Sequence, residues 1–268
     1  NDSDVVLQYI NSNDLERLAP MGTSCPDHFL HTKIQPLILN LGTDTDTSDT
    51  EVILKKLQPA FNTYRKEYHD YYETCKKENS PAIRDPNPVI IIYPGVGMFS
   101  FAKNKQTTRV ASEFYINAIN VMRGAEAISA YTALPRQEAF DIEYWLLEEA
   151  KLQRMPKEKP LSRKVALITG AGGGIGKAIA EDRLEEAIRT YKADTASYAV
   201  CDVTQADSII GAFKKACLDF GGVDIVVHSA GLAISKPLEE TTEQDWDLLQ
   251  DVLVKGQFEL AKHAVATM

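Results

Sequence analysis

The sequence predicts an α/β protein: an upstream α/β segment followed by a doubly wound parallel sheet that is incomplete. Apolar runs of strand length alternate with amphipathic stretches of helical spacing along the chain. The run at residues 165–168 is continuously apolar, as is the centre of the run at 224–228, Ile225-Val-Val227, which is typical of parallel strands covered on both faces. Glycine-containing turns follow the runs at 89–93, 165–168 and 224–228. Together these observations favour strand–turn–helix units.

Composition limits the class of protein. The 268 residues are 44% hydrophobic and 25% charged, which fits a soluble globular protein with a sizeable core. A net charge of −9 argues against nucleic acid or an anionic membrane as the main partner. The four cysteines have no CxxC spacing, no apolar run is long enough to span a membrane, and no signal peptide is visible. We therefore expect a reduced, cytoplasmic protein that acts on a small-molecule substrate.

The upstream half contains the first predicted elements. We expect helices at residues 13–18, 52–57, 60–77, 107–122 and 140–152, and a strand at 89–93. The strand follows the turn signal Asp85-Pro-Asn-Pro88 and leads through Pro94-Gly-Val-Gly97 towards the next helix. Residues 43–50 form a polar loop. Tyrosines at helical spacing between 64 and 72 are interpreted as a packing face.

A charged, proline-bearing stretch around residues 155–160 is the predicted domain boundary. It divides the chain into residues 1–154, a linker at 155–163 and a second domain at 164–268. In the second domain we expect strands at 165–168, 197–201 and 224–228. Helices are expected at 208–220, closed by Gly221-Gly222, at 242–254 and at 257–268.

The stretch Thr169-Gly170-x-x-x-Gly174-Ile175-Gly176 carries the main functional signal. It lies directly after a predicted strand and before a predicted helix, where a glycine turn lets backbone approach a diphosphate and the helix start attracts the anion. Two further turns, Asp202-Val203 and Ser229-Ala230-Gly231, follow predicted strands. Ligands of open α/β sheets bind at such strand ends.

These residues resemble the short-chain dehydrogenase/reductase family over about residues 164–268, and the resemblance implies a Rossmann-type fold. It implies that the backbone at Gly170, Gly173, Gly174, Ile175 and Gly176 faces the cofactor phosphates. Asp202 and Val203 would flank the adenine, with Ala230 and Gly231 on the ribose and nicotinamide side. The turn at 171–173 has no basic side chain for a 2′-phosphate, so we expect NAD, with NADP not excluded.

Four features depart from the family pattern. His228-Ser229 stands where paired asparagines are usual, and Leu253 stands where an asparagine often supports the proton relay. Only 26 positions separate Gly176 from Asp202, too few for the expected helix–strand–helix–strand series, which needs roughly 40. We expect an omitted segment near residues 180–181. No Tyr-x-x-x-Lys follows the glycine motif, so the catalytic residues are expected beyond Met268, and both ends of the chain look cut.

The upstream half resembles the fusions of rhamnulose-phosphate aldolase with a short-chain dehydrogenase. The resemblance lies in residues 25–33, 93–101 and 139–151. It implies a class II aldolase that releases lactaldehyde and an NAD-linked dehydrogenase that acts on it. His28 and His31 do not match the His-x-His spacing of the aldolase zinc ligands, so no metal ligand is predicted, and loop-capping or substrate contact is favoured. Gly95 and Gly97 form either a plain turn or an anion-binding turn.

Two alternatives to an oxidoreductase remain open. One is a zinc class II aldolase (a lyase) as the main activity, and the other is a non-catalytic dinucleotide-binding fragment. Proteins resembling the dehydrogenase half are usually homo-oligomers, so we expect one here.

Overall fold

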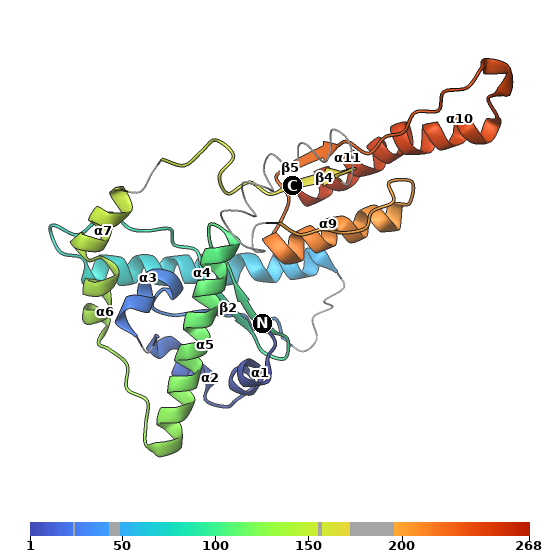
Figure 1. Ribbon diagram of the computed structural model, residues 1–268. Coiled ribbons are helices and arrows are strands. Elements are labelled where there is room, and N and C mark those ends of the chain that lie inside the picture. The colour runs from blue at the N-terminus through green and yellow to red at the C-terminus, as the bar shows by residue number, and fades with distance from the viewer. Residues whose placement is uncertain (24, 43–48, 155–156, 172–195) are drawn as a thin grey trace. The chain divides into compact units, whose positions relative to one another are not determined.

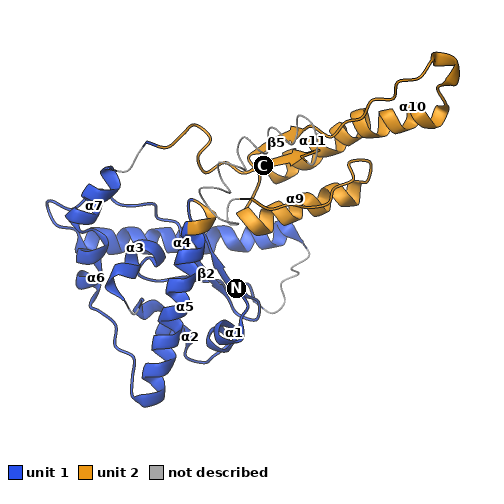
Figure 2. Cartoon of the chain, in the orientation of Figure 1, with its two compact units in different colours: residues 1–103, 107–157 blue, residues 104–106, 158–268 orange. Residues whose placement is uncertain are grey.

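The computed structural model describes residues 1–23, 25–42, 49–154, 157–171 and 196–268. These residues form two compact units (Figure 2). Unit 1 comprises residues 1–103 and 107–157, and unit 2 comprises residues 104–106 and 158–268.

Unit 1 contains a mixed three-stranded sheet among its described residues, in the order β1–β2–β3. β1 (Leu37–Ile38) runs parallel to β2 (Ile90–Tyr93), and β3 (Gly97–Ser100) runs antiparallel to β2. The predicted strand at 89–93 is confirmed. The helix predicted after a short loop does follow, beginning at Lys105, but the segment before it was not predicted as a strand: Gly95, with a φ of +81°, turns the chain back into a hairpin and residues 97–100 form β3.

Helices cover both faces of this sheet (Figure 1). The described elements are α1 (Asp4–Ile10), α2 (Leu15–Leu18), η1 (Ala19–Met21), η2 (Pro26–His28), α3 (Phe29–Thr32), α4 (Thr50–Cys75), α5 (Lys105–Ile128), α6 (Arg136–Glu143) and α7 (Leu146–Gln153). Asp49 caps α4 by accepting from the backbone N–H groups of residues 51 and 52. The two helical stretches predicted at 52–57 and 60–77 belong to this one continuous helix, which runs from Thr50 to Cys75.

The central strand β2 divides the core of unit 1 into two apolar clusters. Ile90 and Ile92 pack with α1, α2 and α5, whereas Ile91 packs with β1, α4 and α6. This alternation follows from the period of two along a strand, and burial of all three isoleucines shows that both faces are covered. The tyrosines of α4 pack in the second cluster, as predicted.

The helix predicted at 140–152 is interrupted in the structure. α6 ends at Glu143, and Tyr144 and Trp145 leave the helical conformation before α7 begins. Tyr144 is buried, and its hydroxyl lies 2.7 Å from the Tyr68 hydroxyl. The contact that draws Tyr144 into the core comes from a distant helix, so periodicity along the chain does not reveal it.

Unit 2 has a parallel pair of strands among its described residues, β4 (Ala166–Thr169) and β5 (Ile225–His228). Its helical elements are α9 (Ala206–Phe220), η3 (Leu238–Glu240), α10 (Glu243–Gln250), the π-helical turn η4 (Asp251–Lys255) and α11 (Gly256–Thr267). The predicted strands at 165–168 and 224–228 and the helix predicted at 208–220 are confirmed. The helices predicted at 242–254 and 257–268 form one uninterrupted helical run, from α10 through η4 to α11. Gly221 ends α9 in the left-handed conformation, with a φ of +87°.

The strand predicted at 197–201 is wrong. Residues 197–201 are described but join no ladder, and the side chains of Tyr198 and Val200 are 89% and 94% exposed. A strand needs a neighbour that accepts its backbone hydrogen bonds, and no described strand lies beside this one. None of the described helices is long and apolar enough to cross a membrane.

Candidate functional site

The candidate site lies where β4 and β5 end side by side. The strands are parallel, with Thr169 opposite His228, so the turns that follow them leave the same edge of the sheet. The Thr169 hydroxyl is buried at this edge and accepts from the backbone N–H of Ser229 at 3.3 Å and of Ala230 at 3.2 Å. One side chain thus fastens the end of β4 to the turn after β5.

Gly170 brings the two predicted turns into contact. It has a φ of +67°, a conformation that suits glycine. A Cβ atom at this position would lie 2.6 Å from Ala230 N, 2.7 Å from Ala230 Cα and 2.7 Å from the Ser229 carbonyl carbon. These atoms are backbone and cannot turn away, so only a residue without a side chain fits. The two turns predicted at strand ends thus meet through Gly170, Ser229 and Ala230.

His228 has a defined role in this arrangement. The Thr169 hydroxyl already accepts two N–H groups, so its own hydrogen donates to His228 Nδ1, 3.0 Å away. In the neutral ring the remaining proton then sits on Nε2. That atom is buried and has no hydrogen-bond partner among the described residues. His228 thus pairs with Thr169 through Nδ1, and its second ring nitrogen has no hydrogen-bond partner among the described residues.

Asp202 and Val203 belong to a hydrogen-bonded turn, although the described residues just before it, 197–201, do not form a strand. Asp202 Oδ1 accepts from the backbone N–H and the hydroxyl of Thr204, at 2.9 and 2.8 Å. These hydrogen bonds hold the pKa of Asp202 below its usual range. Val203 is buried, and its carbonyl and side chain lie against Gly256, where a Cβ atom would come within 3.0 Å. Asp202 Oδ2 makes no hydrogen bond to a described residue.

The other predicted residues of the cradle are placed only in part. Gly173, Gly174, Ile175 and Gly176 lie outside the described residues. A Cβ atom on Gly231 would lie 3.4 Å from a methyl group of Leu253, which belongs to the π-helical turn η4. Leu253 thus packs against the turn where the family often places an asparagine, so an apolar side chain occupies the position of a relay group.

The upstream histidines pack on an aromatic ring. His28 stacks on Phe114 with ring centroids 3.8 Å apart, and His31 meets the same ring edge-on at 5.3 Å. Desolvation lowers the pKa of both imidazoles, and for His28 the neighbouring His31 adds to the effect. The described residues contain no group of three or more side chains that could hold a metal ion.

The turn at residues 94–97 fits the interpretation as a plain structural turn rather than an anion-binding turn. The N–H of Gly95 donates to Asn11 Oδ1 at 2.7 Å, which fastens the hairpin to the segment after α1. Since this donor is already used, it is not available to an anion.

The sequence pattern did not predict a buried polar network in unit 1. Glu143 is 1% exposed and accepts from the hydroxyls of Tyr68 and Tyr71, at 2.7 and 3.3 Å. Burial raises the pKa of this carboxyl group. Lys33 lies over the Tyr68 ring, 3.9 Å from its centroid, and burial lowers the pKa of its amine to about 8. The available signal was the tyrosine stripe of α4, which predicted packing but not a polar partner.

Comparisons with known proteins match the two halves of the chain to different family models. The model described as "Aldolase class II, second domain" matches residues 1–152, and the model described as "Enoyl-(Acyl carrier protein) reductase" matches residues 170–268. An uncharacterized oxidoreductase YuxG of Bacillus subtilis (strain 168) is 35% identical over 288 aligned positions, which cover 100% of this chain and 41% of that protein. The hydroxynaphthalene reductase-like protein Arp2 of Metarhizium acridum (strain CQMa 102) is 35% identical over 134 positions, covering 43% of this chain and 49% of the relative.

Among solved structures, a short-chain dehydrogenase/reductase of the glucose/ribitol dehydrogenase type from Brucella melitensis is similar. It is 29% identical and covers 39% of this chain and 52% of its own, with a TM-score of 0.36. The chain spans about half or less of the length of the curated relatives it matches.

Proposed function

Because the chain belongs to the class II aldolase second-domain family over residues 1–152 and carries a short-chain dehydrogenase/reductase domain after it, we propose that unit 2 binds NAD for an oxidoreductase reaction. The observation that carries the proposal is the joint between Gly170 and the Ser229-Ala230 backbone. This contact places the start of the glycine motif beside the turn after β5, at the carboxyl edge of two parallel strands, where a dinucleotide binds in folds of this kind.

The residues present fit such a cofactor. Gly170 lets the start of the glycine motif pack directly against the Ser229-Ala230 backbone, so the two turns lie together where the cofactor would bind. Asp202 Oδ2 is an available acceptor for an adenine amino group, and the buried Val203 holds this turn against Gly256. Ala230 and Gly231 line the ribose and nicotinamide side. Bound NAD would supply the hydride chemistry, and these residues would bind and orient it.

We further propose that the whole protein acts on a small hydroxy or aldehyde substrate such as lactaldehyde, supplied by a rhamnulose-phosphate aldolase activity. The resemblance of the upstream half to such fusions supports this, as does the aldolase match of residues 1–152. Because the chain spans 41% of the length of its Bacillus relative, turnover is to be measured on the full-length gene product.

Calorimetric titration with NAD and NADP tests the binding proposal. In the Gly170→Ala variant the new methyl group collides with the Ala230 backbone, so we expect NAD affinity to fall about tenfold or more. Gly222→Ala is the matched control, because a Cβ atom there meets nothing within 4 Å. Circular dichroism confirms that both variants are folded. Equal NAD affinity for wild type and the Gly170→Ala variant would contradict the proposed cradle.

A zinc class II aldolase is the second candidate function, and the family match over residues 1–152 favours it. Its test is cleavage of a ketose 1-phosphate by the full-length product before and after treatment with a chelator. Activity that is lost with the metal and restored by Zn²⁺ would support a lyase. If the protein binds NAD but shows no oxidoreductase turnover, the result would instead support a dinucleotide-binding fragment without catalysis.

A further inference from the structure

The hydroxyl group of Thr169 uses all of its hydrogen-bonding capacity. It accepts from the backbone N–H groups of Ser229 and Ala230, at 3.3 and 3.2 Å, and these two bonds occupy both of its lone pairs. Its single hydrogen is left for His228 Nδ1, which lies 3.0 Å away. This arrangement requires that Nδ1 carries no hydrogen. The protonation state of His228 is therefore part of what fastens β4 to the turn after β5.

A protonated His228 ring is incompatible with this arrangement. A charged imidazole carries a hydrogen on both nitrogens, so the new Nδ1–H would meet the hydroxyl hydrogen of Thr169. The hydroxyl can accept the Nδ1–H only if it releases one of the two backbone N–H groups that it holds. The other ring nitrogen, Nε2, is buried and has no hydrogen-bond partner among the described residues. The described residues thus offer the charged ring no acceptor unless the turn after β5 loosens.

The surroundings of His228 do not supply a counter-charge. Along β5, His228 shares a face with Val226, which packs on the apolar cluster of α9 and α11. β4 has no titratable side chain. The titratable side chains of the two helices are Asp207, Lys214, Lys215, Cys217 and Asp219 of α9 and Glu259, Lys262 and His263 of α11. Lys215 pairs with Asp219, and Glu259 lies 3.3 Å from Lys262 Nζ and 3.6 Å from His263 Nε2. None of these side chains forms an ion pair or hydrogen bond with His228, so a charge on its ring would stay uncompensated by the described residues.

We propose that His228 is a positioning residue for the cofactor site and makes NAD binding depend on pH. The uncharged ring keeps the Thr169 hydroxyl in the orientation that fastens the turn after β5, and protonation of the ring releases this turn. Gly170 packs against the same Ser229-Ala230 backbone, so the start of the glycine motif loses its support at the same time. The proposal rests on NAD binding by unit 2. NAD affinity should fall as the solution becomes more acid, in the range where histidine takes up a proton.

The carboxylate of the proposed cradle does not produce such a pH dependence. Hydrogen bonds hold the pKa of Asp202 below its usual range, so this side chain stays charged between pH 7.5 and 5.5. A loss of NAD affinity in this interval therefore points to a histidine. Unit 2 has two, His228 and His263, and His263 contacts Glu259 and the Phe213 ring rather than Thr169. His263→Gln is accordingly the matched control.

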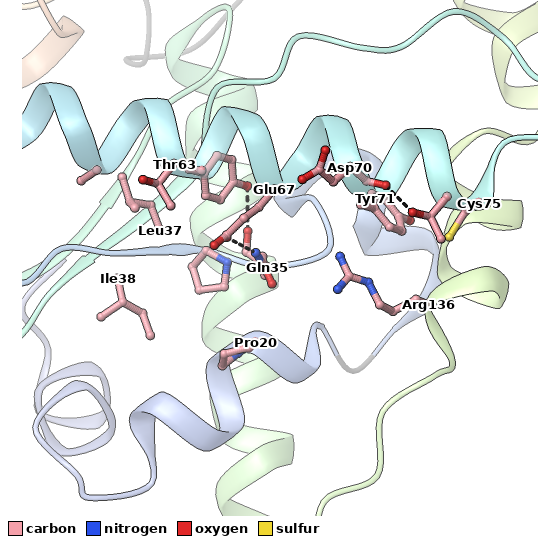
Figure 3. Close-up of a pocket in the computed structure, with 14 residues that line it drawn as sticks. Pro20, Gln35, Leu37, Ile38, Thr63, Glu67, Asp70, Tyr71, Cys75 and Arg136 are labelled. Carbon is pink, nitrogen blue, oxygen red and sulfur yellow. Dashed lines mark hydrogen bonds between the residues drawn. The ribbon is translucent and has the colours of Figure 1, made fainter.

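A cavity in unit 1 is another place where an anionic cofactor would find a basic side chain. Its volume is about 800 Å³, and Figure 3 shows Arg136 extending towards it from α6, with Glu67 and Asp70 on α4. The two carboxylates repel a diphosphate, and no histidine lines the cavity. NAD bound there would be lost in Arg136→Ala and would not respond to a change at His228. Arg136→Ala thus separates this cavity from the cradle.

Hydrogen exchange followed by mass spectrometry tests the turn itself, without cofactor, on the full-length gene product. The readout is protection of the segment spanning residues 225–232 at pH 7.5 and 5.5, corrected for the intrinsic pH dependence of exchange. In wild type and in His263→Gln we expect protection of the Ser229 and Ala230 N–H groups to fall about tenfold at pH 5.5. In His228→Asn it should be equal at both pH values, because the amide oxygen accepts from Thr169 and does not titrate. Unchanged protection in wild type would overturn the proposal.

Calorimetric titration with NAD at the same two pH values tests the consequence for the cofactor. A binding step that requires one ordinary histidine to be uncharged loses up to about tenfold in affinity between pH 7.5 and 5.5. We expect a loss of about this size in wild type, His263→Gln and Arg136→Ala, and equal affinities at both pH values in His228→Asn. The absence of NAD binding at pH 7.5 would reject the cofactor site and this proposal with it. Binding that loses as much affinity in His228→Asn as in wild type would reject the role of His228 alone.

Discussion

The Thr169 side chain is the contact on which the candidate cradle depends most directly. It is 5% exposed and joins β4 to His228, Ser229 and Ala230 through one hydroxyl group. Thr169→Val keeps the shape but leaves two N–H groups and an imidazole nitrogen without this partner, so we expect a loss of about 1–3 kcal/mol in the free energy of unfolding. Urea denaturation followed by circular dichroism measures it. Thr169→Ser retains the hydroxyl and should cost less; equal losses in the two variants would contradict the hydrogen-bonding role.

His28 and His31 make the stability of unit 1 depend on pH. Desolvation lowers the folded-state pKa of both rings from the ordinary value of 6.5, with Asp27 opposing the effect at His28. As pH falls below 6.5 the unfolded chain takes up protons first, so the free energy of unfolding should fall. The double variant His28→Gln/His31→Gln should lose less stability between pH 7.5 and 5.5 in urea denaturation. His69→Gln, which changes an exposed residue of α4, is the control and should behave as wild type.

The residues differ in how far the sequence could predict them. Gly170 was predictable, because its spacing after a strand reflects a local backbone requirement. The roles of Thr169 and His228 were not, since each depends on pairing with a strand about 60 residues away. Glu143 shows the same limit: its partners Tyr68 and Tyr71 come from another helix, and nothing in its local pattern distinguishes it from a solvated acid.

At the scale of elements, two helical glycines of unit 2 should respond in opposite ways to alanine. A Cβ atom on Gly211 of α9 meets nothing within 4 Å, so Gly211→Ala should add about 0.5–1 kcal/mol through helix propensity. A Cβ atom on Gly256 lies 3.0 Å from Val203 O and 3.2 Å from Val203 Cβ, so the contact should cancel or reverse that gain. Urea denaturation of both variants checks the pair. An equal gain in the free energy of unfolding for Gly256→Ala would show that the turn at 202–203 moves away from the new methyl group without loss of stability.

Elements were predictable where the local pattern determined them. β2, β4, β5 and α9 followed from apolar runs and from the glycine stop after α9. β3 was missed because its four residues depend on a hairpin partner, and the strand at 197–201 was predicted without a described neighbour to pair with. The division of one predicted helix into α6 and α7 depends on the burial of Tyr144. Each error concerns a contact that is distant in sequence.

At the scale of the whole molecule, the linker at 155–163 remains a prediction about domain organisation. The two compact units of the structure divide between residues 157 and 158. The alignment to the Bacillus protein spans 288 positions, more than the 268 residues of this chain, so it includes positions where the relative has residues and this chain has none. We propose that these positions include the omitted segment expected near residues 180–181. Alignment of the encoding gene across that region checks the proposal, and a gap elsewhere would contradict it.

The separate cores of the two units predict two thermal transitions. The apolar clusters around β2 contain only residues of unit 1, and the cluster around Val203, Phe213 and Leu260 contains only residues of unit 2. NAD at 100 times its Kd should stabilise the unit that binds it by about 2.7 kcal/mol, which raises the Tm of a unit of this size by roughly 10 °C. Differential scanning calorimetry should therefore show NAD moving one transition and leaving the other in place. In the Gly170→Ala variant a tenfold loss of affinity puts the same NAD concentration at about 10 times Kd, so the stabilisation should fall to about 1.4 kcal/mol and the shift to roughly half. A single transition that NAD shifts as a whole would show instead that the two units unfold as one cooperative body.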